Sequence, residues 1–353
     1  MNDTKKIKIN LYAKKKKNKG QEVDSAIFEE IALISDFDEF NVSLDGKKNN
    51  NYDIRVFHQR NVINYIKQNK KRINVCSIDF VPIYNKNIIK CPEFLFNIYK
   101  NYIFSFYKKA DEVIISNPYF IKPLITNGIT QDKITFIPKY VANERFYPLN
   151  KEETLKIRLS YKFKENEFVV LGVGSAKVSK GFDDFCKVAK KMNDVKFVWV
   201  GKKLTKPNII YPSLLIKDED IPSNLTFLGD IPRSEMNNLY NACDLVLLPS
   251  YQEVFPIAAL ESAKCLKPFI VRDLDLYKGI FFSNYIYGKD INEFVDLIYL
   301  FKEDKSKYLE AVEWSKKISY YYSKDHVAQM WRDYYLDIYK KHARKTLACS
   351  TKQ

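Results

Sequence analysis

The sequence has 353 residues, of which 46% are apolar and 29% charged, which fits a globular chain of two domains and argues against extended disorder. Its net charge is +15, and residues 54–109 alone carry +9. No apolar run reaches the roughly 18–20 residues of a membrane-spanning helix, and no secretory signal precedes the first strand-like run, so we expect a cytoplasmic protein.

Runs rich in branched and aromatic residues recur along the chain, with helical spacing between them. They predict strands at residues 7–12, 53–57, 73–78, 112–116, 134–138, 168–173, 195–200, 225–228, 244–249 and 268–271. Strands that alternate with helices imply parallel sheets. A polar, proline-containing stretch at 146–153 predicts a linker. We therefore expect an α/β protein of two doubly wound, Rossmann-like domains, 1–150 and 151–321, with a ligand cleft between them. A helix at 322–345 should pack back on the first domain.

Within the basic stretch, residues 94–109 combine aromatic side chains with flanking lysines. Leu95, Ile98, Tyr102 and Phe106 fall on one helical face at 100° per residue, and further aromatic residues widen it. Such a helix suits an anionic bilayer surface, where each lysine adds about 1 kcal/mol. The expected membrane contacts are Lys86, Lys90, Tyr99, Lys100, Tyr102, Phe106, Lys108 and Lys109. The alternative is a core helix in a lysine-rich composition. Nucleic acid is not an expected partner, because no recognised binding motif accompanies the charge.

A glycine-bearing loop follows the strand predicted at 168–173. Gly172 and Gly174 are followed by Lys177, where a dinucleotide-binding fingerprint requires a third glycine, and no P-loop motif is present. Lys180 and Gly181 then open a helix. The loop can approach phosphates closely and neutralise them with a lysine; the alternative is an ordinary turn beside surface lysines.

Two glutamates flank the start of a predicted helix after the strand at 244–249. Glu253 lies in the loop, Pro256 stands at a first-turn position, and Glu261 follows inside the helix. A helix start offers free N–H groups to a diphosphate. Carboxylates on either side can accept hydrogen bonds from hydroxyls, which fits a nucleotide sugar, although two glutamates at this spacing are also common on solvated helices.

Cysteines and histidines give no sign of a metal centre. The six cysteines are scattered without a Cys-x-x-Cys pair, and three histidines are too few for a His-based site, so the cysteines are expected as small core residues. Asp218-Glu-Asp220 and Asp273-Leu-Asp275 resemble a metal-binding Asp-x-Asp, but such triplets are frequent by chance. We expect no cofactor and no obligatory metal.

Taken together, these motifs resemble those of retaining glycosyltransferases of family 4, which have the GT-B fold. Glu253 and Glu261 match the family's Glu-x7-Glu motif, and residues 174–181 match its glycine-to-Lys-Gly loop. The runs 225–231 and 239–250 match the segments before the two glutamates. Within the family, the chain is most similar to bacterial membrane glycolipid synthases that glycosylate diacylglycerol or its monoglycosyl form, through 19–26, 115–121 and 271–278.

The resemblance implies a role for individual residues. Glu253 would hold the donor hexose near the reacting carbon, Glu261 the ribose hydroxyls, and Lys180 would counter charge on the leaving diphosphate. Gly20 would let a first-domain loop close over that diphosphate. The remaining expected donor contacts are Gly174, Ser175, Lys177, Gly229, Val254, Phe255, Pro256 and Ile257.

Two positions depart from the family. An arginine usually stands where this chain has Ser175, so Lys177 would substitute for it. A histidine that faces the reacting centre is replaced by Asp79, while His58 lies one strand earlier. Asp79 would accept a hydrogen bond from a sugar or acceptor hydroxyl, or it is a strand-end aspartate with a structural partner.

The expected activity is retaining transfer of glucose or galactose from a UDP-sugar to a diacylglycerol-type lipid, by an enzyme bound peripherally to the inner face of the cell membrane. The first alternative is a family 4 hexosyltransferase of capsule or cell-wall polysaccharide synthesis. The second is a non-catalytic sugar-nucleotide-binding protein that has lost turnover with the usual histidine and arginine.

Overall fold

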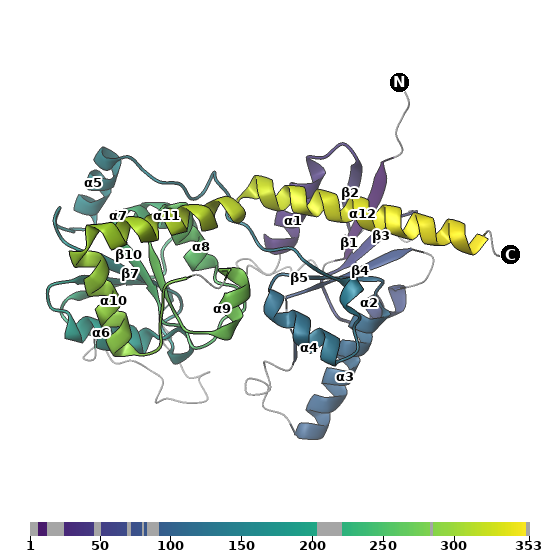
Figure 1. Cartoon of the computed structure of the whole chain (residues 1–353), viewed down its shortest axis with the longest axis horizontal. Helices are drawn as coiled ribbons and strands as arrows, with labels where there is room; N and C mark the ends of the chain where they lie inside the picture. The colour runs from purple at the N-terminus through teal and green to yellow at the C-terminus, as the bar shows by residue number, and fades with distance from the viewer. Residues whose placement is uncertain are drawn as a thin grey trace. The chain divides into compact units, whose positions relative to one another are not determined.

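The computed structural model describes residues 6–12, 25–45, 51–68, 72–79, 81–82, 92–202, 221–282 and 285–350, without the side chains of 25, 26, 28 and 345–350. The chain divides into two compact units (Figure 1). Unit 1 comprises Met1–Pro138 and Asp325–Gln353, and unit 2 comprises Lys139–Lys324. The boundary predicted after residue 150 falls inside unit 2.

Unit 1 is built on a parallel sheet of order β2-β1-β3-β4-β5-β6. Its strands are β1 (Ile7–Tyr12), β2 (Phe40–Leu44), β3 (Ile54–Phe57), β4 (Ile73–Ile78), β5 (Glu112–Ile115) and β6 (Ile134–Phe136). Its helices are α1 (Ser25–Ser35), α2 (Val62–Lys67), α3 (Glu93–Lys109), α4 (Ile121–Thr126) and, from the end of the chain, α12 (Lys324–Ser350), with short 3-10 turns at η3 (Pro118–Phe120) and η4 (Gln131–Lys133). The sequence analysis missed β2, an edge strand.

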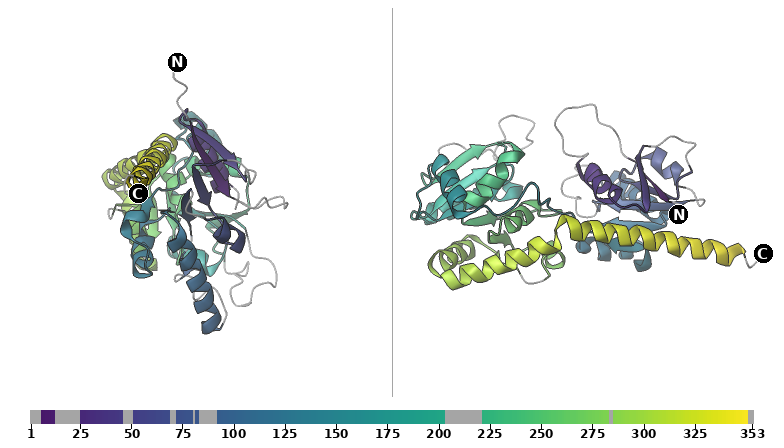
Figure 2. Two further views of the ribbon diagram at one scale, coloured as in Figure 1. Left: turned by 90° about the vertical axis from the view of Figure 1, so that its right-hand side faces the viewer. Right: turned by 90° about the horizontal axis from the view of Figure 1, so that it is seen from above.

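The C-terminal helix α12 lies along unit 1 (Figures 1 and 2). Tyr335 is fully buried and donates its hydroxyl to Glu30 Oε1 at 2.7 Å. Lys341 Nζ and His342 Nε2 lie 2.7 and 3.1 Å from the buried Glu112 carboxylate. A segment more than 200 residues away in sequence therefore supplies the partners of two buried carboxylates, and an unpaired buried charge is costly.

Unit 2 is built on a second parallel sheet, of order β12-β11-β10-β7-β8-β9. Its strands are β7 (Val169–Val173), β8 (Lys196–Val200), β9 (Leu225–Gly229), β10 (Leu245–Leu248), β11 (Phe269–Arg272) and β12 (Tyr287–Gly288). Its helices are α5 (Lys151–Ser160), α6 (Phe182–Lys191), α7 (Met236–Ala242), α8 (Ile257–Lys264), α9 (Asp275–Ile280), α10 (Ile291–Glu303) and α11 (Lys305–Tyr321), with 3-10 turns at η5 (Val178–Lys180) and η8 (Arg233–Glu235).

Alternate residues of these strands fill two separate cores, as the period of a strand requires. Leu171 and Val246 face the core that α7, α8 and α9 cover, whereas Val170 and Leu247 face the core under α6 and α10. Both faces of the sheet are therefore apolar, which explains why its strands read as continuous hydrophobic runs. The two parallel sheets confirm the expected α/β class with two Rossmann-like units.

The stretch predicted as a linker at 146–153 is part of unit 2. Phe146 is 1% exposed and packs edge-on against Tyr240, and the Leu149 amide donates to Asn241 Oδ1 at 2.8 Å. Asn150 and Glu153 then form a capping box at the start of α5. The polar residues that suggested a linker in the sequence are the cap of a helix.

Candidate functional site

The strand order of unit 2 reverses between β7 and β10, which are neighbours in the sheet. From β7 the chain proceeds outward to β9, and from β10 it proceeds outward in the opposite direction to β12. Doubly wound sheets bind ligands beyond the carboxyl ends of the strands at such a reversal. The loops that leave these two strands, 174–181 and 249–256, are those singled out in the sequence.

Glycine allows the two loops to approach each other closely. Gly174 and Gly181 have φ values of 143° and 72°, a region that disfavours other residues. A Cβ on Gly181 would lie 2.1 Å from the carbonyl oxygen of Pro249. Ser175 and Lys177 lie half-buried in the same loop. The turn therefore requires glycine at positions 174 and 181. Donor binding by Gly174, Ser175 and Lys177 stays a prediction.

Lys180 and Glu253 meet across the two loops. The Lys180 ammonium donates to the Glu253 carboxylate, and the two side chains keep 27% and 17% of their surface exposed. A ligand that enters from solvent can therefore reach both. An ammonium beside a carboxylate can hold an anionic group and a hydroxyl-bearing group at the same time, because charged partners make the stronger hydrogen bonds.

The start of α8 differs in detail from the prediction. Pro256 is the N-cap, and the helix begins at Ile257, whose N–H donates to the Phe255 carbonyl at 3.0 Å. The Ile257 N–H thus has an acceptor within the chain, and donor binding at Ile257 stays a prediction. Val254 is 46% exposed, whereas the Phe255 side chain is buried and packs against Tyr322.

Glu261 is 3% exposed and has two partners that the sequence analysis missed. Arg233 Nη2 donates to Oε1 at 2.5 Å, and the Tyr240 hydroxyl donates to Oε2 at 2.9 Å. Burial, followed by the charge of Glu261, raises the pKa of the Tyr240 phenol well above its ordinary value, so the phenol keeps its proton and donates. A carboxylate has about four acceptor positions, so one such group can accept hydrogen bonds from several donors.

Gly229 ends β9 with a φ of 72°, and the space where a Cβ would stand is open. Its carbonyl accepts from the Gly201 N–H at 2.7 Å. The structure therefore leaves room beside Gly229, and its expected place in the base pocket stays a prediction.

In unit 1, Asp79 follows β4 and accepts a hydrogen bond from the Ser116 hydroxyl at 3.2 Å. Arg60 follows the neighbouring strand and donates to the Ser77 carbonyl at 2.9 Å. Burial disfavours the charged guanidinium, but nearby groups that include Asp79 raise the pKa of Arg60 above its ordinary value. His58 lies elsewhere, with Nε2 3.1 Å from the buried Glu30 carboxylate.

The predicted membrane face of α3 needs correction. Phe106 is fully buried in the core between α3 and the sheet, where it packs edge-on against Phe57 of β3. Tyr102 is half-buried and lies against Tyr65 of α2. Tyr99 is 39% exposed, Lys100 is half-buried, and Lys108 and Lys109 are exposed. Lys86, Lys90 and Gly20 lie outside the described residues.

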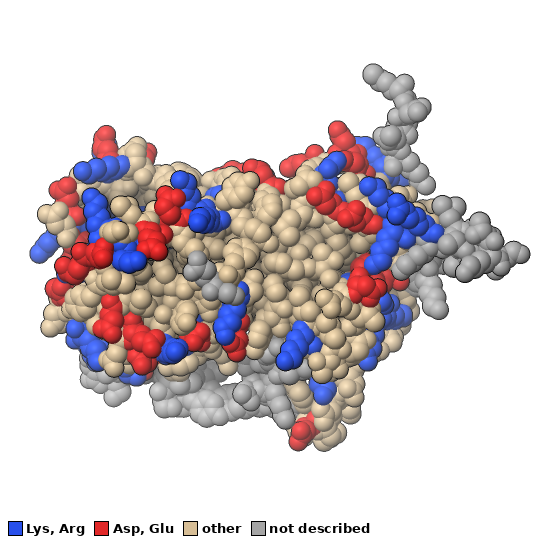
Figure 3. Space-filling model, viewed as in Figure 1, with Lys and Arg blue, Asp and Glu red and all other residues tan. Residues whose placement is uncertain are grey.

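Two helices of unit 1 instead expose large apolar side chains that were not predicted as a site. On α2 these are Val62, Ile63 and Ile66, and on the first turns of α3 they are Phe94, Leu95 and Ile98, each between 45% and 70% exposed. Figure 3 shows the projecting end of α3 as mostly uncharged surface, with an acidic group at its tip and a basic group nearby. The signal in the sequence was the i, i+1, i+4 spacing of 62, 63 and 66 beside a basic stretch. Within the described ranges, no helix is both long and apolar enough to cross a bilayer.

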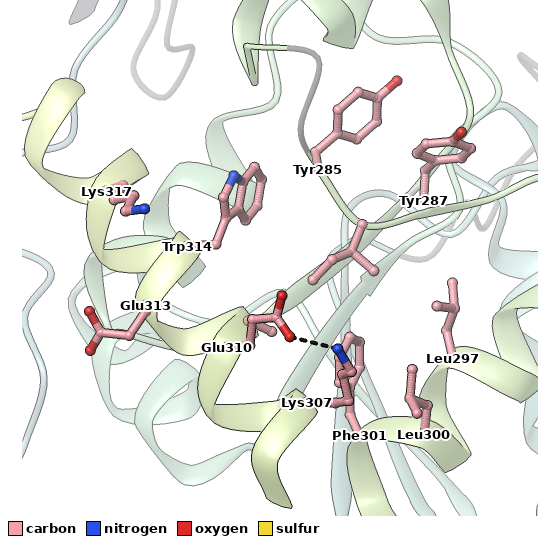
Figure 4. Close-up of a pocket in the computed structure, with 12 residues that line it drawn as sticks. Tyr285, Tyr287, Leu297, Leu300, Phe301, Lys307, Glu310, Glu313, Trp314 and Lys317 are labelled. Atoms are coloured by element: carbon pink, nitrogen blue, oxygen red, sulfur yellow. Dashed lines mark hydrogen bonds and ion pairs between the residues drawn. The ribbon is translucent and has the colours of Figure 1, made fainter. Parts of the chain in front are cut away.

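A cavity of about 640 Å³ opens elsewhere on unit 2, between α10, α11 and the segment around β12 (Figure 4). Tyr285, Tyr287, Trp314 and Phe301 form much of its wall, and Lys307 pairs with Glu310 at its rim at 2.8 Å. None of the predicted site residues lines this cavity. It is therefore distinct from the pair of loops described above.

Known proteins resemble this chain in both sequence and fold. The family model "Glycosyl transferases group 1" matches residues 153–318. The chain is 32% identical to the alpha-galactosylglucosyldiacylglycerol synthase of Streptococcus pneumoniae (strain ATCC BAA-255 / R6), over 94% of this chain and 90% of that protein. It is 29% identical to the processive diacylglycerol alpha-glucosyltransferase of Acholeplasma laidlawii, over 46% and 50%.

Among solved structures, HepE of Anabaena in complex with UDP-glucose superposes with a TM-score of 0.71 at 16% identity, over 94% of this chain and all of that one. At this identity the likeness concerns the fold, which is the expected GT-B class. The similarity to the streptococcal synthase spans nearly the whole chain, and the family model covers the loops that carry Lys180 and Glu253. The chain therefore belongs to the glycosyl transferases group 1 family.

Proposed function

We propose that this glycosyltransferase moves a hexose from a UDP-sugar to diacylglycerol or a monoglycosyl-diacylglycerol, with retention at the anomeric carbon. The acceptor class is supported by the two relatives whose names specify diacylglycerol-type products or substrates. The donor class is supported by the fold shared with HepE, which was solved with UDP-glucose. Within this chain, the pairing of Lys180 with Glu253 at the strand-order reversal carries the proposal.

In the proposed reaction, the bond between the anomeric carbon and the β-phosphate oxygen breaks, and its electron pair leaves with UDP. The acceptor hydroxyl oxygen forms the new bond, and its proton passes to the departing β-phosphate oxygen of UDP. Lys180 offsets the charge that develops on the departing diphosphate, which is the largest contribution expected from this site. Glu253 accepts hydrogen bonds from the hexose, and no metal is needed, because the ammonium and nearby amides supply the positive charge.

Asp79 is proposed to accept a hydrogen bond from a hydroxyl of the sugar or acceptor. Its position after a strand of unit 1, beside the Ser116 hydroxyl, supports this role. The Arg60 guanidinium is a nearby cation, since Asp79 is among the groups that raise the pKa of Arg60.

The direct test is a screen of the purified protein with UDP-glucose and UDP-galactose against diacylglycerol and glucosyl-diacylglycerol in mixed micelles, with and without EDTA. We expect a lipid-linked hexose in the α configuration, by mass and NMR analysis, and UDP release that EDTA leaves unchanged. Transfer only to a soluble or polyprenyl-linked saccharide would support a role in polysaccharide synthesis. UDP binding without release for any donor would support a non-catalytic protein, and loss of activity in EDTA would contradict the metal-free mechanism.

We also propose that the exposed side chains Val62, Ile63, Ile66, Phe94, Leu95 and Ile98, here called the apolar face, insert into the membrane that holds the acceptor. The two helices touch, since the Tyr65 hydroxyl lies 3.1 Å from Ser105 Oγ. Three large apolar side chains are exposed on each helix, and such exposure in one unit favours a binding partner. The charge of +9 on residues 54–109 favours an anionic lipid surface as that partner.

Replacing Ile63, Ile66, Leu95 and Ile98 by serine is expected to lower partitioning into vesicles with anionic lipid by more than about tenfold, because each buried aliphatic side chain contributes about 1.5–3 kcal/mol. The exposed side chains carry little packing, so the melting temperature should stay close to that of the wild type. Leu159→Ser with Leu309→Ser, at comparably exposed sites of unit 2, is the control. If the variant with all four substitutions co-sediments with vesicles as well as the wild type does, the proposed apolar face is refuted.

A further inference from the structure

A buried ion pair links the end of β11 to the helix that follows the site loop 174–181. Arg272 ends β11, and Asp184 lies in the first turn of α6, directly after the loop 174–181. The guanidinium donates to Asp184 Oδ2, and the two side chains are only 8% and 9% exposed. The pair thus brings together residues 88 positions apart in the chain.

Arg272 also donates hydrogen bonds to the backbone carbonyls of residues that follow two other strands. Its Nε donates to the Pro249 carbonyl at 3.0 Å, and its Nη1 donates to the Lys289 carbonyl at 3.0 Å. Pro249 follows β10 and begins the loop that carries Glu253. One guanidinium therefore fixes the start of this loop and the helix that follows the other loop.

Tyr251 adds a second connection between the same loops. Its hydroxyl donates to Asp184 Oδ2 at 2.7 Å, and the Arg272 guanidinium stacks over its ring at 3.9 Å. Its own N–H donates to the Ser179 carbonyl at 3.0 Å. Ser179 directly precedes Lys180, and Tyr251 stands two residues before Glu253, so these contacts lie immediately beside the proposed catalytic pair.

We propose that Arg272, Asp184 and Tyr251 are positioning residues that hold the two loops in the register at which Lys180 and Glu253 face the donor. This inference rests on the proposed function of that pair. Buried ion pairs are often no more stabilising than apolar side chains of similar size, so stability alone does not account for one at this place. A displacement of about 1 Å at a reacting group can cost about a hundredfold in rate.

A second ion pair of unit 2, at the amino ends of β7 and β10, provides a control. Arg158 Nη1 lies 3.1 Å from Asp244 Oδ2, with side-chain exposures of 8% and 29%. Asp244 also accepts from the Val169 N–H at 2.8 Å, at the amino ends of β7 and β10. Arg158 is as buried as Arg272, Asp244 is more exposed than Asp184, and the pair touches neither site loop.

The test compares Asp184→Asn/Arg272→Met with Asp244→Asn/Arg158→Met, since each double change removes both charges of its ion pair. With UDP-hexose and the lipid acceptor, we expect kcat of the first variant to fall at least about tenfold. Its dissociation constant for UDP, measured by calorimetry, should rise at least about threefold, as a displaced Lys180 meets the diphosphate poorly. The control should keep both values within about twofold at a similar loss of melting temperature.

Tyr251→Phe provides a second variant in case the first does not fold, because the ring is 48% exposed and only one hydrogen bond is lost. It should lower kcat several-fold without a change in melting temperature. The inference would be overturned if a folded variant kept the kcat and UDP affinity of the wild type. It would also be overturned if the control variant lost as much kcat and UDP affinity as Asp184→Asn/Arg272→Met. A wild type that transfers to no acceptor would refute the proposed function instead, and the UDP titration would still decide the role of the ion pair.

Discussion

Replacing Glu253 by alanine is expected to lower kcat by at least about a hundredfold, as measured for removal of a preorganised electrostatic group. The carboxylate contacts Lys180 and remains 17% exposed, so both substrate orientation and the placement of the ammonium depend on it. A partly exposed ion pair contributes only about 1 kcal/mol to stability. The melting temperature should therefore fall by no more than about 2–4 °C.

Glu310→Ala is the control for this change, because Glu310 also pairs with a lysine in unit 2 but lies on α11. Its turnover should match that of the wild type. If Glu253→Ala unfolds the protein, the loop has a structural role that the contacts do not indicate. If it keeps more than a tenth of wild-type kcat, Glu253 does not hold the donor.

Replacing Glu261 by alanine is expected to affect both stability and donor affinity. Loss of the acceptor leaves the fully buried Tyr240 hydroxyl without its partner, which costs about 1–3 kcal/mol of unfolding free energy. Arg233 is half exposed and water can solvate it, so the loss of its ion pair should lower the unfolding free energy only slightly. The ribose contact that the family resemblance implies for Glu261 predicts, in addition, that UDP binding weakens by about tenfold or more.

A double-mutant cycle separates the two effects. Adding Tyr240→Phe to Glu261→Ala removes the stranded hydroxyl, so part of the lost stability should return in chemical denaturation. UDP affinity should remain low in the double variant, because the carboxylate is still missing. An unchanged UDP dissociation constant in Glu261→Ala would rule out the ribose contact and leave Glu261 with a structural role only.

Helix α3 illustrates how far periodicity predicts structure. The spacing of its apolar residues predicted a helix over 94–109, and the structure has one at Glu93–Lys109. The prediction was wrong for Phe106, because the exposed side of the helix depends on how α3 packs on the sheet, and Phe106 lies in that core beside Phe57. A helix whose apolar residues extend around most of its circumference does not specify its own buried side.

The missed strand β2 has a related cause. Phe40, Val42 and Leu44 alternate with polar residues, but the run is short and lies at the edge of the sheet, paired only with β1. A short alternating run is a weak indication of a strand, because such a run becomes a strand only when it pairs with a neighbouring strand. The stretch at 146–153 was likewise misread as a linker, because its polar residues cap a helix and its Phe146 is buried by distant partners.

By itself, the sequence determined the local features of the site: two parallel α/β units, the glycines that make the turn at 174–181, and glutamates before and within α8. Tertiary structure decided which side chains meet. Lys180 and Glu253 are 73 residues apart, and they pair because β7 and β10 are neighbours where the strand order reverses. Arg272 reaches Asp184 for the same reason. Strand order arises from the packing of whole elements, so the partner of a buried charge cannot be read from the residues around it.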